Sequence, residues 1–296
     1  MLNRNLEIYI MVAERGSITE TANELYVSQP AISKAILKLE EELHVTLFYR
    51  DKRRGLLLTE VGKEILLHAR KMQDSANRIH QIARQENNLL GGKLRVASFP
   101  IFTGAVLPAV IREFRRQYPA VSFELLDRDP RTAQRLAAEH AADLAISASP
   151  FTDLDHELLL EDQMIAIFPK DDPLPESVSL FGDTQHLVFC EAGRETVTDI
   201  LKDASRIRFS ESLIVQNHET IISMVERGNG VGIIDEFTFR AIRSDLQVCP
   251  VRPRIQISIE LAAPDLQNLT PAAAAFADLL RAYISRQAPR GFYAYE

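Results

Sequence analysis

The stretch from Ser17 to Glu40 constrains the fold more than any other part of this 296-residue sequence. Ser17 followed three residues later by Glu20 is typical of a capping box that begins a helix. Ser28, with Pro30 tolerated in the first turn, is typical of the start of a second helix directly afterwards. The pattern therefore predicts two helices joined by a tight turn.

The second of these helices has an apolar face and a polar face. Its apolar residues recur every three or four positions and are expected to be buried: Ile32, Ala35, Ile36, Leu39 and Leu43. Pro30, Ser33, Lys34, Leu37 and Lys38 are expected on the opposite face, and Glu40, Glu41 and Glu42 gather at the far end. A helix with cations near its N-terminal end and acids near its C-terminal end can enter a DNA groove only with its N-terminal end. With a preceding helix at residues 3–15, ended by Gly16, this pattern predicts a helix-turn-helix unit.

The net charge of −7 conceals two regions of different charge. Residues 1–93 carry 14 Lys and Arg against 12 Asp and Glu, which leaves 20 against 29 from the totals of 34 and 41 for the rest of the chain. The acidity therefore belongs to the larger region. The basic signal is local and consists of Arg50, Lys52, Arg53 and Arg54.

Those cations lie at the tip of a predicted hairpin. Residues 44–50 and 56–59 form two short apolar runs on either side of a charged turn that ends at Gly55. Beside a recognition helix, such a hairpin is suited to contact phosphates or the minor groove, as the wing of a winged helix does. A plain solvated hairpin is the alternative.

A long helix is predicted from Thr59, its N-cap, roughly to Asn88. Its apolar residues recur at intervals of four and three among polar ones: Val61, Ile65, Ala69, Met72, Ala76, Ile79 and Ala83. Such a narrow stripe is typical of a coiled-coil seam and predicts association of two copies of the chain. The alternative is packing of the stripe on the chain's own second domain.

After Gly91 and Gly92 the pattern changes to alternating strands and helices. Strands are expected at 94–98, 121–126, 143–146, 164–168, 187–190, 213–215, 231–234, near Val248 and at 257–261. Helices are expected at 104–118, 131–140, 195–204, 218–227 and from Thr270. This repeat predicts an α/β layer with a parallel sheet.

With these residues in place, the chain resembles the LysR-type transcriptional regulators. The motifs that carry the resemblance most specifically are Ser-Gln-Pro-Ala-Ile-Ser-Lys at 28–34, Leu-Glu-Glu-Glu-Leu at 39–43, Leu-Phe-Tyr-Arg at 47–50 and Leu-Thr-Glu-Val-Gly at 58–62. Weaker matches continue at 107–108, 114–119, 143–146 and 225–233. The resemblance implies a winged helix-turn-helix, a dimerising linker helix and an effector-binding domain of two α/β subdomains, like a periplasmic binding protein. It also implies homotetramers that bind double-stranded promoter DNA at interrupted inverted repeats under the control of a small-molecule co-inducer, with RNA polymerase as a further candidate partner.

The resemblance also implies domain boundaries. These place the winged helix-turn-helix at 1–58, the linker helix at 59–90 and the effector-binding domain at 91–296, with subdomain I at about 93–165 and 267–290 and subdomain II at about 166–266. The chain departs from the family pattern at His44, where the family usually has Gly after Glu-Glu-Leu, and at Pro130, which displaces a small or hydroxyl residue. Because a positive φ costs His more energy than Gly, the helix end before His44 is expected to be closed differently or strained.

The candidate DNA contacts come from both helices and the wing: Thr19, Thr21, Ser28, Gln29, Pro30, Ser33, Lys34, Lys38, Arg50, Arg53 and Arg54. Gln29 is expected nearest the base edges because its amide can pair with two groups on adenine. Ser28 is expected to cap its helix and to meet a phosphate through the helix start. Thr19 and Thr21 are candidates for phosphate contacts, with ordinary cap and surface roles as the alternative.

The candidate effector contacts lie where strands end and helices begin: Ser98, Phe99, Pro100, Thr103, Arg131, Arg194, Asn217 and His218. A bilobed α/β domain places its ligand in the cleft at such positions. Arg131 or Arg194 is suited to hold a carboxylate, so a small organic anion is the expected effector. Hydroxyls and amides at helix starts also serve as ordinary caps.

Other classes of protein find little support. Cys190 and Cys249 are too few for a disulfide scaffold and lack metal-ligand spacing, so they are expected to be inert core thiols, with a redox pair as the alternative. The glycines of 228–232 precede a strand instead of following one, so they do not form a dinucleotide loop. We expect no enzymatic activity, cofactor or metal.

The chain is expected to be soluble and cytoplasmic, without membrane contact, because no signal-like start and no apolar run of about 18 residues occurs. A cytoplasmic solute-binding protein without a transcriptional role is the alternative function.

Overall fold

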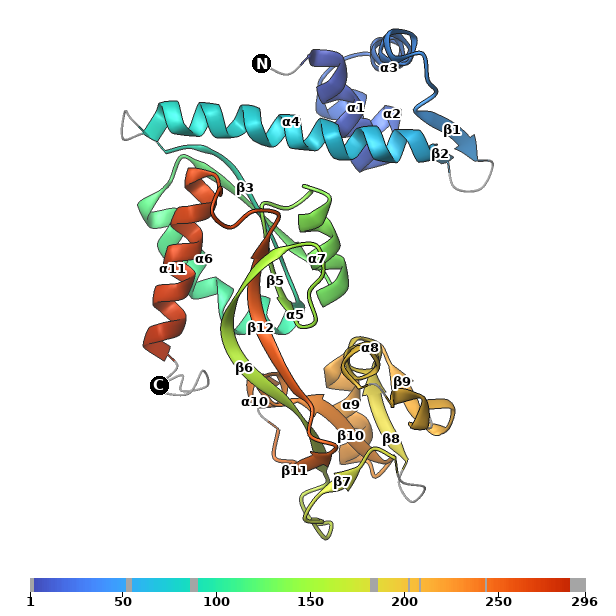
Figure 1. Cartoon of the computed structure of the whole chain (residues 1–296), viewed down its shortest axis with the longest axis vertical. Helices are drawn as coiled ribbons and strands as arrows, with labels where there is room; N and C mark the ends of the chain where they lie inside the picture. The colour runs from blue at the N-terminus through green and yellow to red at the C-terminus, as the bar shows by residue number, and fades with distance from the viewer. Residues whose placement is uncertain are drawn as a thin grey trace. The chain divides into compact units, whose positions relative to one another are not determined.

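The chain folds as two units, shown in the computed structural model of Figure 1. The structure describes residues 3–51, 55–85, 90–181, 186–201, 203–207, 209–242 and 244–287. Unit 1 comprises residues 1–92 with 139–141, and unit 2 comprises residues 93–138 with 142–296. Among the described residues, no helix has the length and apolar character needed to cross a bilayer.

Unit 1 begins with three helices whose ends follow the sequence signals. The helices are α1 (Arg4–Arg15), α2 (Ile18–Glu24) and α3 (Gln29–Leu43). Gly16 ends α1 in the left-handed conformation, with φ of 63°. The Ser17 hydroxyl accepts the Glu20 N–H at 3.2 Å, which confirms the predicted cap of α2.

The core of unit 1 lies between these helices and the start of the next one. Ile32, Ile36 and Leu39 of α3 are buried, as the periodicity predicts. Leu43 is 41% exposed, so its predicted burial is wrong, because α3 ends at this residue. His44 closes the helix with φ of 55°, and its N–H donates to the Glu40 carbonyl. The family's glycine position is therefore occupied here by a strained His residue.

A two-stranded hairpin follows α3. Its strands β1 (Phe48–Asp51) and β2 (Gly55–Leu58) pair antiparallel, as predicted. Residues 52–54 at the tip lie outside the described residues. The Glu40 carboxylate accepts hydrogen bonds from the backbone N–H groups of Leu47, at 2.6 Å, and Phe48, at 3.3 Å. This side chain therefore ties the start of the hairpin to α3.

Helix α4 (Glu60–Gln85) crosses close to the segment before the wing. The Thr59 hydroxyl accepts the Gly62 N–H at 2.9 Å, which confirms the predicted cap. A Cβ atom at Gly62 would overlap the Leu47 carbonyl oxygen, and the Tyr9 hydroxyl donates to the Gly62 carbonyl. Gly62 is therefore required for the close approach of α4 to the rest of unit 1.

The apolar stripe of α4 divides into two parts. Ile65 and Ala69 of the stripe pack in the core of unit 1 beside Leu66, whereas Val61 is 37% exposed. Farther along, the side chains of Met72 and Ile79 are 55% and 67% exposed. The second half of the stripe is therefore accessible in a single copy of the chain.

Unit 2 is a mixed α/β structure. Its strands are β3 (Gly92–Ser98), β4 (Val121–Asp127), β5 (Leu144–Ala148), β6 (Asp155–Phe168), β7 (Val178–Ser179), β8 (Leu187–Cys190), β9 (Leu213–Val215), β10 (Val231–Asp235), β11 (Gln247–Arg252) and β12 (Gln256–Ala263). Its α-helices are α5 (Pro100–Ala105), α6 (Leu107–Gln117), α7 (Pro130–Ala138), α8 (Glu191–Ile200), α9 (His218–Glu226), α10 (Glu236–Ile242) and α11 (Pro271–Gln287).

The sheet is not parallel throughout, so that prediction is wrong. The strand order is β4-β3-β5-β12-β6-β10-β8-β9. The pairs β3–β5, β8–β9 and β8–β10 are parallel, whereas β6 and β12 are antiparallel to each other and to their other neighbours. These two strands run through two lobes, the first built on β3 to β5 and the second on β7 to β11 (Figure 1).

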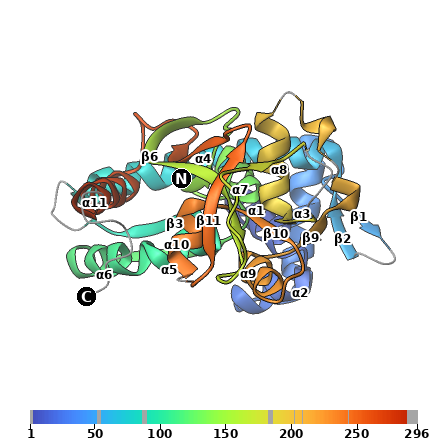
Figure 2. The same ribbon diagram turned by 90° about the horizontal axis from the view of Figure 1, so that it is seen from below.

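Helices cover both faces of the first lobe. Helices α6 and α11 lie side by side (Figures 1 and 2) and join through rings of Phe114, Phe123 and Phe276, whose centroids are 5.2 to 6.0 Å apart. On the other face, α7 packs through Ala133 and Ala137 against small residues of the sheet. Small side chains bring α7 close to the sheet, near the carboxyl end of β5.

Two helix predictions need correction, and one helix was not predicted. The helix expected at 104–118 is two helices, because α5 begins earlier, at Pro100, and the chain breaks at Val106. The helix expected at 195–204 begins at Glu191, directly after β8. Helix α10 was not predicted at all, because its seven residues are too few for a clear period.

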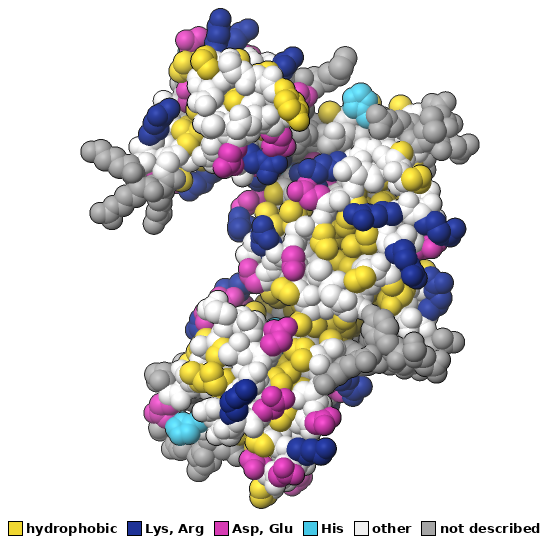
Figure 3. Space-filling model, turned by 180° about the vertical axis from the view of Figure 1, so that it is seen from behind, with side chains coloured by type: hydrophobic (Ala, Val, Ile, Leu, Met, Phe, Trp, Pro, Cys, Tyr) yellow, Lys and Arg dark blue, Asp and Glu magenta, His cyan; other side chains and the backbone are white. Residues whose placement is uncertain are grey.

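Charged side chains of both signs are interspersed over the face shown in Figure 3.

Candidate functional site: a recognition helix and an interlobe cleft

Helix α3 exposes the polar side that the sequence predicts. Gln29, Pro30, Lys34 and Lys38 are exposed, and Ser33 is half-buried. The buried Ile32, Ile36 and Leu39 anchor the opposite side in the core. Because the helix begins at Gln29, its free N–H groups and its polar side chains lie at the same end.

The structure corrects one hydroxyl assignment, that of Thr21, and confirms Ser28 as the N-cap residue of α3 without a side-chain bond. Thr21 is fully buried, and its hydroxyl donates to the Ser17 carbonyl at 2.9 Å, so it is not placed to meet a phosphate. Ser28 is exposed but makes no side-chain cap; only its carbonyl accepts bonds from the first turn of α3. Thr19 is exposed on α2 and remains a candidate.

The wing contributes one described candidate. Arg50 is exposed on β1, next to the tip. Arg53 and Arg54 lie outside the described residues, so their assignment stays a prediction.

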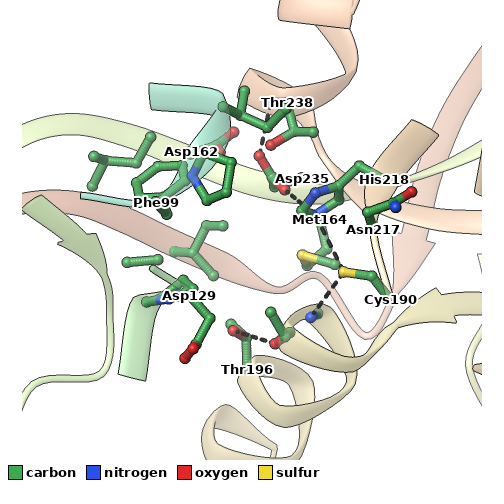
Figure 4. Close-up of a pocket in the computed structure, with 18 of the residues that line it drawn as sticks. Phe99, Asp129, Asp162, Met164, Cys190, Thr196, Asn217, His218, Asp235 and Thr238 are labelled. Atoms are coloured by element: carbon green, nitrogen blue, oxygen red, sulfur yellow. Dashed lines mark hydrogen bonds and ion pairs between the residues drawn. The ribbon is translucent and has the colours of Figure 1, made fainter. Parts of the chain in front are cut away.

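In unit 2, a cavity of about 170 Å³ lies between the two lobes (Figure 4). Phe99 and Asp129 come from the first lobe and face His218, Asn217 and Cys190 from the second. The carboxyl ends of β3, β5, β8 and β10 and the starts of α5, α7, α8 and α9 meet here. This is the position at which open α/β sheets bind ligands.

The structure brings half of the predicted effector residues to this cavity. Phe99, Pro100, Asn217 and His218 line it. Ser98 and Thr103 do not line it; both hydroxyls are buried, and within the described ranges neither has a hydrogen-bond partner. Their placement at a strand end and a helix start was read correctly, but their side chains point into the packed interior.

The two arginines expected to hold a carboxylate also lie outside the cavity lining. Arg131 pairs with Asp199 at 2.5 Å and with Glu195 at 3.2 Å, both on α8. Arg194 pairs with Glu191 in the first turn of α8. Both guanidinium groups therefore already have carboxylate partners within the protein.

His218 lies at the centre of a polar chain in the second lobe. Its Nε2 is 3.2 Å from Cys190 Sγ and 3.6 Å from an oxygen of Asp235. Cys190 Sγ also accepts the N–H of Gly193 at 3.2 Å and caps α8. Burial lowers the pKa of His218, but the hydrogen bond and electrostatic interaction with Cys190 and the charges of Asp235 and Glu219 outweigh it and raise that pKa to about 9. His218 therefore carries a proton at neutral pH.

A second buried acid, Asp162, lies on β6 next to α10. One of its oxygens accepts the N–H groups of Gln163, at 2.8 Å, and Phe237, at 3.1 Å. Burial, followed by the charge of Asp235, raises the pKa of Asp162 to about 8. Two carboxylates and one imidazole thus share a space between apolar walls.

Sequence reasoning missed most of the acidic side of the cavity. Asp235 comes directly after the predicted apolar strand 231–234, and Cys190 ends the strand 187–190. Both could have been predicted from the rule that ligands bind at strand ends. Asp162 and Met164 lie inside β6, and no local pattern marks them.

Comparison with known proteins agrees with both units. A family model described as "Bacterial regulatory helix-turn-helix protein, lysR family" matches residues 3–63, and one described as "LysR substrate binding domain" matches residues 87–285. The chain belongs to the LysR family of transcriptional regulators. It is 38% identical to the HTH-type transcriptional regulator YoaU of Bacillus subtilis, over 96% of this chain and 99% of that protein. It is 30% identical to the HTH-type transcriptional regulator CysB of Burkholderia cenocepacia, over 81% and 80% of the two chains.

Solved structures of LysR regulators share the fold. Full-length OxyR from Pseudomonas aeruginosa superposes with a TM-score of 0.73 and 24% identity, over 96% of this chain and 94% of that one. The LysR family regulator CbnR superposes with a TM-score of 0.58 and 21% identity, over 96% and 99%. The winged helix-turn-helix and the two-lobed α/β domain of this chain are therefore the family architecture.

Proposed function

We propose that this LysR regulator reads promoter DNA with α3 and the wing, and that a co-inducer bound in the interlobe cavity controls its action there. The observation that carries the DNA-reading part is the exposed polar start of α3 above a fully buried apolar side. A helix held in this way presents its first turns to a major groove.

The proposed base contacts are those of the α3 start. Gln29 and Ser33 supply hydrogen-bonding groups, and Lys34 and Lys38 supply positive charge toward bases or phosphates. Ser28, Pro30 and Thr19 border this surface, and Arg50, Arg53 and Arg54 extend it along the wing. Thr21 is withdrawn from the set because its hydroxyl is buried and bonded.

The proposal includes self-association, because one α3 helix contacts too few base pairs for useful specificity. A single helix contacts only a few base pairs, so useful specificity requires two or more copies at a fixed spacing. The exposed Met72, Ile79 and Ile82 of α4 provide an apolar surface for such pairing. A solved structure of full-length CbnR in complex with its target DNA supports DNA binding by a protein of the same fold. Pairing of dimers into tetramers and contact with RNA polymerase are further parts of the proposal.

The test is DNA binding by the full chain. The probe is a fluorescent duplex from the region upstream of this gene, with a scrambled duplex beside it. Gln29→Ala should weaken binding to the upstream duplex more than to the scrambled one. Lys34→Ala should weaken both and reduce the salt dependence of binding by about one ion. Lys71→Ala, which removes an exposed charge from α4, should change neither value.

Binding that is absent, or that is unchanged in Gln29→Ala and Lys34→Ala, would contradict the assignment. A chain that binds small molecules but no duplex at low salt would instead be a solute-binding protein.

A further inference from the structure

We propose that the ligand of the interlobe cavity is a small organic cation, with an ammonium group between Asp162 and Asp235 and an apolar body against Phe99, Met164 and Ile257. The inference rests on the proposed function, because it assigns the chemical class of the co-inducer of that same cavity. It replaces the organic anion expected from the sequence.

The charges that line the cavity favour a cation. Its acidic side chains are Asp129, Asp162, Glu219 and Asp235, of which Asp162 holds a proton at neutral pH until a cation binds. The described lining holds one basic side chain, His218, and neither Lys nor Arg. His218 interacts with Cys190, Asp235 and Glu219, so this one imidazolium is outnumbered by the acidic side chains of the lining. A bound carboxylate would add a further negative charge to this group.

Three of the helix starts around the cavity, those of α7, α8 and α9, are also occupied by the protein's own groups. Asp129 accepts the Thr132 N–H at 2.9 Å at the start of α7. Asn217 accepts the Thr220 N–H at 2.9 Å at the start of α9. The Cys190 sulfur does the same for α8, and Glu191 and Glu219 lie in the first turns of α8 and α9. The positive ends of α7, α8 and α9, which would otherwise attract an anion, are thus already compensated, whereas the short helix α5 has no side-chain cap.

Two unpartnered polar atoms mark where the cation binds. Thr238 is 1% exposed, lines the cavity and, within the described ranges, has no partner for its hydroxyl. The second oxygen of Asp162 is also buried and has no partner among those residues. Figure 4 shows both side chains on the same side of the cavity, next to Asp235. An ammonium group carries three donors and would satisfy Asp162, Asp235 and Thr238 together.

A bound cation should change the protonation of Asp162. The pKa of Asp162 is raised to about 8 by burial, by Asp235 and, more weakly, by Glu236, while the backbone N–H groups of Gln163 and Phe237 oppose the rise. At neutral pH the unliganded Asp162 therefore holds a proton. A bound cation would stabilise the charged carboxylate, so binding should release up to one proton.

The size of the cavity limits the ligand to roughly one six-membered ring. Its volume of about 170 Å³ is close to that of engineered apolar cavities that hold one benzene molecule. A ring-sized body fills the space between Phe99, Met164 and Ile257, and one amino group reaches the acids. Matched probes are therefore cyclohexylamine, cyclohexanol and cyclohexanecarboxylate, which differ mainly in charge.

The experiment is calorimetric titration of the full chain with the three probes at neutral pH. We expect the amine to bind at least tenfold more tightly than the alcohol, and the carboxylate to bind most weakly. Repeating the amine titration in two buffers of different ionisation enthalpy should reveal the released proton. Asp162→Asn and Asp235→Asn should each weaken amine binding at least tenfold, and Thr238→Val, which keeps the shape of the side chain, should weaken it less. Asp171→Asn, at an exposed position, is the matched control and should change nothing.

Ala148→Phe, which fills the cavity, should abolish binding of every probe. If the carboxylate binds as tightly as the amine and Ala148→Phe removes it, the inference of a cation is overturned while the cavity remains the ligand site of the proposed function. The inference also fails if no probe binds, or if amine binding survives both acid substitutions. DNA binding by the same variants tests the proposed function separately, since none of these residues belongs to unit 1.

Discussion

Replacing Glu40 should loosen the wing from the recognition helix. Glu40 looks like one of three acids at the end of α3, but it differs from Glu41 and Glu42 in what it contacts. Its half-buried carboxylate accepts the N–H groups of Leu47, at 2.6 Å, and Phe48, at 3.3 Å. These two residues carry the chain from α3 into β1.

The magnitude follows from those two bonds. A hydrogen bond to a charged group contributes about 1.5–3 kcal/mol, and the longer of the two bonds here is weak. Glu40→Ala should therefore lower the free energy of unfolding of unit 1 by about 2–3 kcal/mol. Glu40→Gln keeps an acceptor oxygen without its charge and should lower it by about 1 kcal/mol. Glu42→Ala, on the exposed side of the same helix, should stay within about 0.5 kcal/mol.

Urea unfolding of the full chain can measure this effect within unit 1. The chain contains no tryptophan, so Tyr49→Trp, at a half-exposed position of β1, introduces a single fluorescent reporter of the wing. In that background, a loss of about 2 kcal/mol should shift the midpoint by roughly 1 M urea. If Glu40→Ala shifted the midpoint no more than Glu42→Ala, the carboxylate would not be holding the wing, and the reasoning would be refuted.

Three further outcomes are expected. Gly62→Ala should destabilise unit 1 by about 1–3 kcal/mol in the same urea assay, because the new Cβ overlaps the Leu47 carbonyl. Asp162→Asn should raise the melting temperature of the unliganded chain. An acid whose folded-state pKa is raised to about 8 loses stability as pH rises from about 4 to 8, so the gain should grow over that range in thermal scans and level off above it. Replacing Met72 and Ile79 together by Ser should weaken self-association at least tenfold in sedimentation experiments, and unchanged association would place the interface elsewhere.

Local patterns predicted much of this fold. The start of α2, the buried side of α3, the wing strands and the capped start of α4 all follow from residues within a few positions of one another. Strands β8 and β9 were predicted with the bounds that they have. These features depend on helical or strand periodicity and on caps, which act between neighbours in the chain.

The long strand β6 shows where local patterns end. Only its last five residues, 164–168, were predicted as a strand, although β6 begins at Asp155. The earlier part is rich in charge and only half-buried, so it shows no strand pattern. It forms a strand because β12 pairs with it over 155–163. A partner about a hundred residues away therefore decided that this segment is a strand and that the sheet is mixed.

The sequence by itself determined a winged helix-turn-helix with its polar helix start, a long amphipathic helix and an α/β domain with a cleft at its strand ends. Only the tertiary structure decided what each charged group does there. It bonds Glu40 to the wing, pairs Arg131 and Arg194 with acids of α8, and brings Asp162 and Asp235 together from distant strands. The physical reason is that the ionisation state and the partners of a charged group depend on its neighbours and its burial. In this cavity those neighbours come from segments far apart in the sequence.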